Sequence, residues 1–141
     1  MAGSPARMRM RRGLIPLTRN RIGTGSMQHL EDVATISAED KTILREVRAI
    51  IARLVPAATL YLYGSGARGA REPDSDLDLL ILTPGPVLRS EERRVAEALY
   101  DLELARGVVI SLLWFAQADW DAALTWATPF RRQVETEAVF V

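Results

Sequence analysis

Two short runs of residues in the middle of the chain have types and spacing that could carry chemistry. The first is Gly64-Ser65, which follows a β-branched and aromatic run typical of a strand. Glycine lets the backbone approach a bulky ligand closely and adopt a positive φ. A short helix beginning inside the turn at 64–69 would direct N–H groups at an anion, and the Ser65 hydroxyl and the Arg68 guanidinium would add donors. This run indicates either a phosphate site or an ordinary connection between a strand and a helix.

The second run is Asp76-Leu77-Asp78, at the start of an otherwise apolar segment. On a strand, residues i and i+2 point to the same face, about 6.5–7 Å apart. Two carboxylates placed side by side repel each other, and aspartate is disfavoured in strands. A divalent cation such as Mg²⁺, which takes oxygen ligands and binds phosphates, would neutralise the pair. The run therefore indicates either a metal site or the solvated end of a strand.

Together the two runs indicate more than either does alone. One would place N–H groups where a phosphate lies, and the other would place two carboxylates on the neighbouring strand. A cation could then be shared between the carboxylates and the phosphate. Catalysis of phosphoryl or nucleotidyl transfer consists mostly of such positioning and charge neutralisation. We therefore expect a site for a nucleotide with Mg²⁺, or with Mn²⁺ in its place.

Strands and helices on both sides must position these runs. A helix is predicted over Ala38–Val55, because Ser37 is a good N-cap and apolar residues recur with a 3.6-residue period. Breakers and apolar patterns predict the other elements: strands Thr59–Tyr63, Asp76–Leu82 and Val108–Phe115, and helices Arg89–Ala105, Ala118–Leu124 and Pro129–Ala138. Because Val108–Phe115 is apolar on both faces, we expect it to be a central strand.

The composition excludes several other classes of site. The 141 residues contain no cysteine, which excludes disulfides, zinc–thiolate sites, iron–sulfur clusters and a cysteine nucleophile. The single histidine, His29, excludes sites that need two or more imidazoles. The 18 basic and 18 acidic residues balance, so net charge gives no reason to expect a nucleic acid or an anionic membrane as partner. The longest strongly apolar stretch, Val108–Ala116, is roughly half of a membrane span, so we expect a soluble, cytoplasmic protein.

The N-terminal segment differs from the rest of the chain. Residues 1–28 contain six arginines and no acid, and they show no apolar period. Such a segment buries too little surface to offset its ordering entropy. We therefore predict a disordered basic arm over residues 1–36 and one domain over residues 37–141. The arm is consistent with a nucleic-acid-binding segment, with an organelle-targeting peptide, or with an extension without function upstream of a natural start at Met27.

The combination of Gly64-Ser65, Ala67-Arg68-Gly69 and Ser75–Leu79 resembles the signature of the polymerase-beta-like nucleotidyltransferase superfamily. Within it, the chain looks most like the small stand-alone prokaryotic nucleotidyltransferase-domain proteins. The resemblance implies the nucleotidyltransferase fold, an α/β (α+β) arrangement in which helices flank a small mixed β-sheet. It also implies that Gly64 and Ser65 bind the triphosphate, and that Asp76 and Asp78 are catalytic residues and metal ligands.

The superfamily pattern includes a third carboxylate on a later strand, and here the sequence departs from it. Ser111, within Val109–Leu112, occupies the expected position. A serine hydroxyl can be neither an anionic ligand nor a base for an incoming hydroxyl. Asp101 and Glu103 precede it on the predicted helix, but spacing does not place either of them in the site.

The resemblance implies an Mg²⁺-dependent enzyme that moves a nucleoside monophosphate from a nucleoside triphosphate, such as ATP, to an acceptor hydroxyl. A domain this short has little room for its own acceptor site, so a partner subunit or a second copy would complete one. Relatives resembling this chain are often antitoxins that silence a HEPN-type ribonuclease toxin by modification, which makes such a toxin a candidate partner. The absence of the third carboxylate favours an alternative, a non-catalytic module that binds nucleotide or another protein.

Overall fold

A computed structural model of the chain describes residues 22–23, 25–122 and 128–141. At its centre is a five-stranded sheet in the order β1-β5-β2-β3-β4. The strands are β1 Gln28–His29, β2 Thr59–Tyr63, β3 Leu77–Thr83, β4 Ile110–Ala116 and β5 Val139–Phe140. The helices are the 3₁₀ helix η1 Leu30–Asp32, α1 Ala38–Leu54, α2 Arg89–Arg106, α3 Gln117–Asp121 and α5 Pro129–Glu137. None of the helices in these ranges has the length and apolar character needed to cross a membrane.

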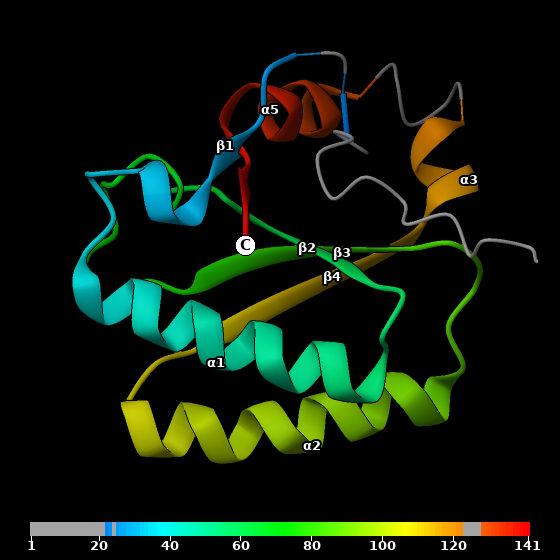
Figure 1. The fold of residues 1–141 in the computed structure, drawn as a ribbon, viewed down its shortest axis with the longest axis horizontal. Coiled ribbons are helices and arrows are strands. Elements are labelled where there is room, and N and C mark those ends of the chain that lie inside the picture. Colours follow the sequence, from blue (N-terminus) through cyan, green and yellow to red (C-terminus); the bar gives the residue numbers. More distant parts are fainter. Residues whose placement is uncertain (1–21, 24, 123–127) are drawn as a thin grey trace, which may run out of the picture.

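The sheet is mixed and is flanked by helices, which confirms the expected α/β fold. β2 pairs antiparallel with β3 on one side and with β5 on the other. β3 and β4 are parallel, and α2 joins them by crossing over one face of the sheet (Figure 1). β1 pairs parallel with β5. Because the chain reverses between β2 and β3, the end of β2 and the beginning of β3 lie at the same end of the sheet.

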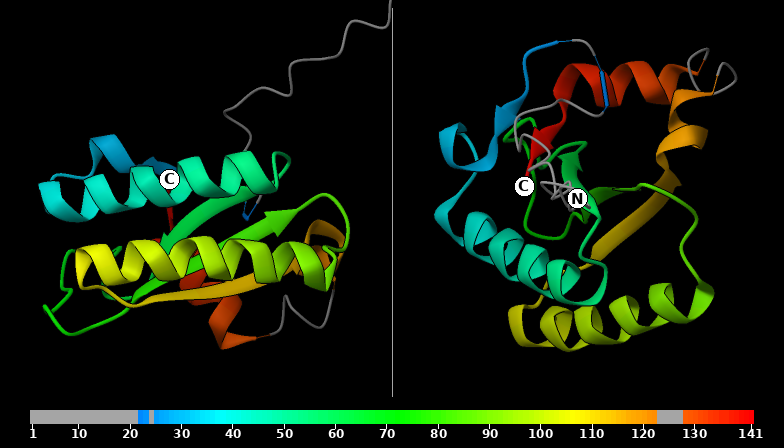
Figure 2. Two further views of the ribbon diagram at one scale, coloured as in Figure 1. Left: turned by 90° about the horizontal axis from the view of Figure 1, so that it is seen from below. Right: turned by 45° about the vertical axis from the view of Figure 1, so that its right-hand side comes forward.

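The helices α1 and α2 lie side by side over one face of the sheet (Figure 1 and Figure 2). α1 begins where predicted because the Ser37 hydroxyl accepts a hydrogen bond from the Asp40 N–H at 3.1 Å. The main core between these helices and the sheet contains Ile43, Leu44, Val47, Leu62, Leu77, Leu79, Ile81 and Val95. Since Leu77 and Leu79 enter this core, the alternate residues of β3 point to the opposite face.

The helices α3 and α5 cover part of that opposite face. A smaller core there contains Ile22, Tyr61, Leu80, Leu82, Trp120, Val134 and Ala138. Arg131 of α5 is also buried, with its guanidinium 4.9 Å from the centre of the Trp120 ring. It donates to the Trp120 carbonyl and pairs with Glu135 at 2.9 Å, which offsets the cost of burying its charge. The smaller core ends before the first residues of β3, where polar side chains begin.

The prediction that Val108–Phe115 forms a central strand is wrong. The strand is β4, and among the described strands it pairs with β3 alone, at the edge of the sheet. All seven of its residues are partly exposed. The strand is nevertheless apolar on both sides, because Leu112 and Trp114 pack against the main core while Leu113 and Phe115 pack against the smaller one.

The folded part of the chain extends upstream of the boundary predicted at residue 37. β1 pairs with β5, and Leu30, Val33 and Ile36 are buried in the main core. These residues show no apolar period because they bury single side chains from an irregular segment, and not one face of a helix or strand. The rest of the predicted arm, residues 1–21 and 24, lies outside the described residues, as does part of the predicted helix Ala118–Leu124.

Candidate functional site

The two functional runs meet where β2 ends and β3 begins. In the sheet register, Tyr63 lies opposite Asp78, and Asp78 lies opposite Ser111 on β4. Asp76 comes just before β3 and has the parity of Asp78, so both carboxylates belong to the face away from α1 and α2. The Ser111 hydroxyl donates a hydrogen bond to Asp76 Oδ2 at 3.1 Å. The predicted carboxylate pair is therefore formed on one face of the sheet, with Ser111 beside it.

Gly64 is in close contact with this pair. Its φ is +74°, a left-handed conformation that favours glycine. A Cβ atom added to Gly64 would lie 2.8 Å from Asp78 Oδ2, so any larger residue would displace the carboxylate. Glycine is needed at this position both for its backbone conformation and for the space that Asp78 occupies. The structure thus brings the predicted phosphate turn against the predicted metal ligands.

Two ionisable groups of the site have raised pKa values, mainly because they are partly buried. Burial raises the pKa of Asp78, and the negative charge of Asp76 raises it further. Burial also raises the pKa of Tyr63, with an additional contribution from the charge of Asp78. A divalent cation at the carboxylate pair would offset the repulsion between Asp76 and Asp78.

Among the described residues, Asp76 and Asp78 are the two carboxylates at this place that could bind a metal ion. Within the described ranges, no group of three or more histidine, cysteine, aspartate or glutamate side chains could hold one. Asp101 is exposed on α2, and the Glu103 carboxylate accepts a hydrogen bond from the Ile110 N–H at 2.7 Å, so neither replaces the third carboxylate. Mg²⁺ commonly binds one or two carboxylates together with substrate phosphates and water. The pair therefore fits an ion that is bound jointly by the protein and a phosphorylated substrate.

The segment 64–69 forms consecutive hydrogen-bonded turns and not the short helix that the sequence suggested. The N–H groups of Ala67 and Arg68 donate to the Gly64 carbonyl at 3.1 and 3.2 Å. Because residues 64–69 are turns and not a helix, a helix N-terminus is not what would bind an anion here. The turn instead presents the Gly64 N–H, the Ser65 side chain and the Arg68 guanidinium, of which the last is half exposed.

Glu137, the last residue of α5, was missed by the sequence-based reasoning and lies at this anion site. Its Oε1 accepts from the Gly64 N–H at 2.9 Å, and its Oε2 accepts from Arg68 Nη1 at 2.7 Å. Gln133, one helical turn earlier, donates its side-chain amide to Oε1 at 2.9 Å. A carboxylate therefore occupies two of the donors that the sequence assigned to phosphate. No spacing rule could have found it, because Glu137 lies 73 residues after Gly64.

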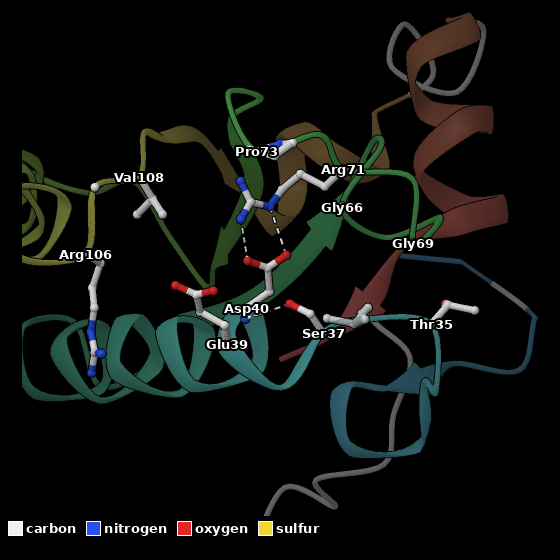
Figure 3. Close-up of a pocket in the computed structure, with 12 residues that line it drawn as sticks. Thr35, Ser37, Glu39, Asp40, Gly66, Gly69, Arg71, Pro73, Arg106 and Val108 are labelled. Atoms are coloured by element: carbon white, nitrogen blue, oxygen red, sulfur yellow. Dashed lines mark hydrogen bonds and ion pairs between the residues drawn. The ribbon is translucent and has the colours of Figure 1, made fainter.

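A second unpredicted contact lies on the α1 side of the same loop. Arg71 binds both Asp40 oxygens, with Nε 2.8 Å from Oδ2 and Nη2 2.5 Å from Oδ1. Its remaining nitrogen, Nη1, donates to the Ser75 carbonyl at 3.0 Å. Only 13% of the Arg71 side chain and 10% of the Asp40 side chain are exposed. Figure 3 shows Arg71 reaching from the loop to the start of α1, a contact that holds the backbone just before Asp76.

A cavity of about 320 Å³ lies beside this ion pair (Figure 3). Its lining includes Ser37, Gly69, Arg71, Arg106 and Val108. The carboxylate pair and Gly64 do not line it, because they belong to the other face of the sheet. The cavity is therefore not the candidate site for a nucleotide.

The chain is similar to a known protein family and to several solved structures. The nucleotidyltransferase domain family matches residues 44–140 of the chain. No curated protein sequence matches it. A toxin–antitoxin structure with AMP-PNP is 18% identical over 74% of this chain and 72% of that chain, with a TM-score of 0.49. A minimal nucleotidyltransferase is 25% identical over 70% of this chain and 92% of that chain, with a TM-score of 0.47.

Proposed function

The chain belongs to the nucleotidyltransferase domain family, and from this membership we propose that it transfers a nucleoside monophosphate from a nucleoside triphosphate to an acceptor hydroxyl. One observation carries the assignment to particular residues. The turn at Gly64 and the carboxylate of Asp78 are in such close contact that a single methyl group would not fit between them. A triphosphate bound at the turn would therefore lie beside the carboxylate pair.

The divalent ion of this reaction would be held by Asp76 and Asp78, and Mg²⁺ or Mn²⁺ fits their oxygen ligands. When bound, such an ion supplies charge neutralisation for the phosphates and for the departing pyrophosphate. The Ser111 hydroxyl, which donates to Asp76 Oδ2, orients that carboxylate and leaves its second oxygen for a ligand.

The other residues of the turn would hold the triphosphate. The Gly64 N–H and the Ser65 hydroxyl are donors to phosphate oxygens, and Arg68 adds a positive charge with two or more N–H groups. The acceptor oxygen attacks the α-phosphorus and forms a new P–O bond, while the bond from that phosphorus to the bridging oxygen breaks. Pyrophosphate leaves with the electron pair, and the proton of the hydroxyl passes to water.

Transfer of label from nucleoside triphosphates tests this function. The wild-type protein, incubated with labelled triphosphates, Mg²⁺ and cell extract, should transfer label to an acceptor. Asp76→Asn and Asp78→Asn should each reduce the rate by about 1,000-fold, since each removes charge stabilisation from the transition state. Asp101→Asn, at an exposed position on α2, is the matched control and should leave the rate unchanged. Transfer that persists in both aspartate variants would assign the chemistry to other residues.

The absence of a third carboxylate favours a second candidate, a non-catalytic nucleotide-binding module. Its prediction is binding without transfer: Mg²⁺ and triphosphate bind, but no acceptor in the extract becomes labelled. Ser111→Asp separates the two candidates, because residue 111 lies opposite Asp78 in the register and a carboxylate there would complete a three-ligand set. Transfer gained by Ser111→Asp would assign the wild-type protein to the binding class.

The acceptor is proposed from the resemblance alone. Relatives that resemble this chain often modify a partner protein, and a HEPN-type ribonuclease toxin is the partner that the resemblance implies. The reaction would then take place in the cytoplasm, where triphosphates are abundant. Affinity purification of the tagged protein from its own cells should recover a helical ribonuclease that becomes labelled. Labelling of a second copy of the chain instead would indicate a homo-oligomer that modifies itself.

A further inference from the structure

The anion site beside the carboxylate pair is already filled by a side chain of the same protein. The Glu137 carboxylate takes the Gly64 N–H, an Arg68 nitrogen and the Gln133 amide, at 2.7–2.9 Å. These three groups are a backbone donor, a guanidinium and a neutral amide, a combination typical of a phosphate site. Only 13% of the Glu137 side chain is exposed, so its carboxylate is placed within the site and not in solvent.

We propose that Glu137 is an internal competitor that imitates a phosphate of the substrate, so that a nucleotide binds only when this carboxylate leaves. The inference rests on the proposed function, because it takes the Gly64 turn and Arg68 as the triphosphate site. A phosphate and a carboxylate cannot share one N–H group and one guanidinium nitrogen without strong repulsion. Displacing Glu137 would free the Gly64 N–H, Arg68 and Gln133 together, which makes Gln133 a further phosphate ligand.

The fold allows this exchange without unfolding. Glu137 ends α5, and the Ala138 N–H that caps the helix bonds to the Val134 carbonyl independently of the Glu137 side chain. The side chain can therefore rotate outward while α5 and β5 stay in place. Its partner Arg68 is half exposed, so water can solvate the guanidinium during the exchange.

The alternative role of Glu137 is to orient Arg68 and the turn for the substrate. The two roles predict opposite effects of the same substitution. If Glu137 competes, its removal strengthens nucleotide binding. If Glu137 orients, its removal leaves Arg68 and the Gly64 turn less ordered and weakens binding.

Calorimetric titration with ATP and Mg²⁺ distinguishes them. Glu137→Ala should bind ATP about tenfold more tightly than the wild type, the factor expected if the carboxylate fills the site in about nine-tenths of the molecules. Glu137→Gln, which keeps the size of the side chain and loses its charge, should bind between the two. Glu97→Gln, at an exposed position of α2 on the other face of the sheet, controls for the change in net charge and should bind like the wild type. Thermal unfolding verifies that each variant is folded.

The role of Arg68 is tested by repeating the comparison in Arg68→Ala. Because Glu137 loses its charged partner there, the gain from Glu137→Ala should fall to less than about threefold. If Glu137→Ala strengthens ATP binding equally in the wild type and in Arg68→Ala, the effect comes from the change in net charge. That result would overturn the proposal that Glu137 competes with the nucleotide. If the wild type binds ATP and both Glu137→Ala and Glu137→Gln bind it equally or more weakly, the competition by Glu137 is overturned while the proposed function stands. Absence of binding by every variant overturns the proposed function, and the inference with it.

Discussion

Two arginines, three residues apart in the loop between β2 and β3, make contacts of different kinds on the two sides of that loop. Arg71 turns toward α1 and forms a two-bonded pair with Asp40, in which both side chains are nearly buried. Arg68 turns toward α5 and binds Glu137 through one nitrogen, while half of its side chain stays exposed. The α1 contact fixes the loop, whereas the α5 contact can be exchanged for a ligand. A site that binds a substrate needs both.

The strand β3 shows the same division. Leu77 and Leu79 are fully buried in the main core beneath α1 and α2. Asp76 and Asp78 are partly exposed on the opposite face. The period of two in a strand thus attaches the carboxylates to a rigid backbone while leaving them open to a ligand. Substitutions that break the buried Arg71–Asp40 contact should change the stability of the protein. Substitutions of the exposed residues, such as Arg68, should change nucleotide binding.

The largest expected effect on stability comes from the fixed side. Asp40→Asn would leave the Arg71 guanidinium nearly buried without its counter-charge, so we expect the free energy of unfolding to fall by about 3 kcal/mol. Urea denaturation measures this change, and Glu39→Gln, at the exposed neighbouring position, is the matched control. A loss no larger than that of the control would mean that Arg71 does not fix the loop.

A smaller effect, on binding and not on stability, is expected from the open side. Arg68→Ala should weaken ATP binding by about tenfold, or about 1.4 kcal/mol, because the loss of its own phosphate contact outweighs the release of Glu137. Its free energy of unfolding should change by less than about 0.5 kcal/mol, because half of the Arg68 side chain is already in solvent and Glu137 keeps its bonds from the Gly64 N–H and the Gln133 amide. Calorimetry and urea denaturation of the same variant test both halves. A stability loss comparable to that of Asp40→Asn would remove the distinction between the two arginines.

The sequence predicted the parts of this arrangement that depend on local pattern. The strand Thr59–Tyr63 and the start of α1 were predicted correctly, because a β-branched run and an N-cap with a 3.6-residue period are local signals. The carboxylate pair on one face of the sheet, formed by Asp78 of β3 and by Asp76 just before it, followed from the period of two. The family resemblance predicted a site containing Gly64 and Asp78; the structure places these two residues in close contact, and their roles stay predictions.

The parts that the sequence did not predict depend on distant contacts. β1 and β5 have two residues each, too few for any periodicity, and they form because the ends of the domain meet beside β2. The edge position of β4 was missed because an apolar strand between two partial cores has the same pattern as a central one. Glu137 and Asp40 each have another acid nearby on the same helix, and only the folded loop shows which of them binds an arginine.

A third prediction concerns how far the repulsion between Asp76 and Asp78 destabilises the folded protein. Asp78→Asn removes one of two neighbouring charges on one face of the sheet, and relief of such repulsion is worth up to about 1 kcal/mol. The variant should therefore unfold at a higher temperature than the wild type in the presence of EDTA. Mg²⁺ with a non-hydrolysable triphosphate should raise the unfolding temperature of the wild type but not of the variant. An unfolding temperature lowered by Asp78→Asn would show that the carboxylate stabilises the fold instead.

The smallest effect is expected from another arginine pair, Arg106 of α2 with Glu46 of α1, which does not involve the loop and is more exposed than the Arg71–Asp40 pair. The pair makes two hydrogen bonds, with nitrogen–oxygen distances of 3.1 and 2.5 Å. However, 39% of the Arg106 side chain and 38% of the Glu46 side chain are exposed. The bond from Arg106 lowers the pKa of Glu46 below its ordinary value of 4.5. A lowered pKa in the folded state means that the pair stabilises the protein above pH 4.5 and that this contribution is lost as the pH falls through the folded value.

Glu46→Gln should therefore lower the unfolding temperature slightly at pH 7. The difference from the wild type should shrink as the pH falls below 4.5 and close once the pH is below the lowered pKa of Glu46 in the folded protein, where both proteins lack the charge. Circular dichroism melts at pH 7, 5 and 3 measure the difference, with Glu97→Gln as the control for an unpaired acid on α2. If the Arg71–Asp40 pair stabilises the protein because it is buried, the exposed Arg106–Glu46 pair must contribute much less to the free energy of unfolding at every pH. An effect at pH 7 as large as that of Asp40→Asn would mean that two-bonded pairing, and not burial, makes the Arg71–Asp40 pair stabilise the protein.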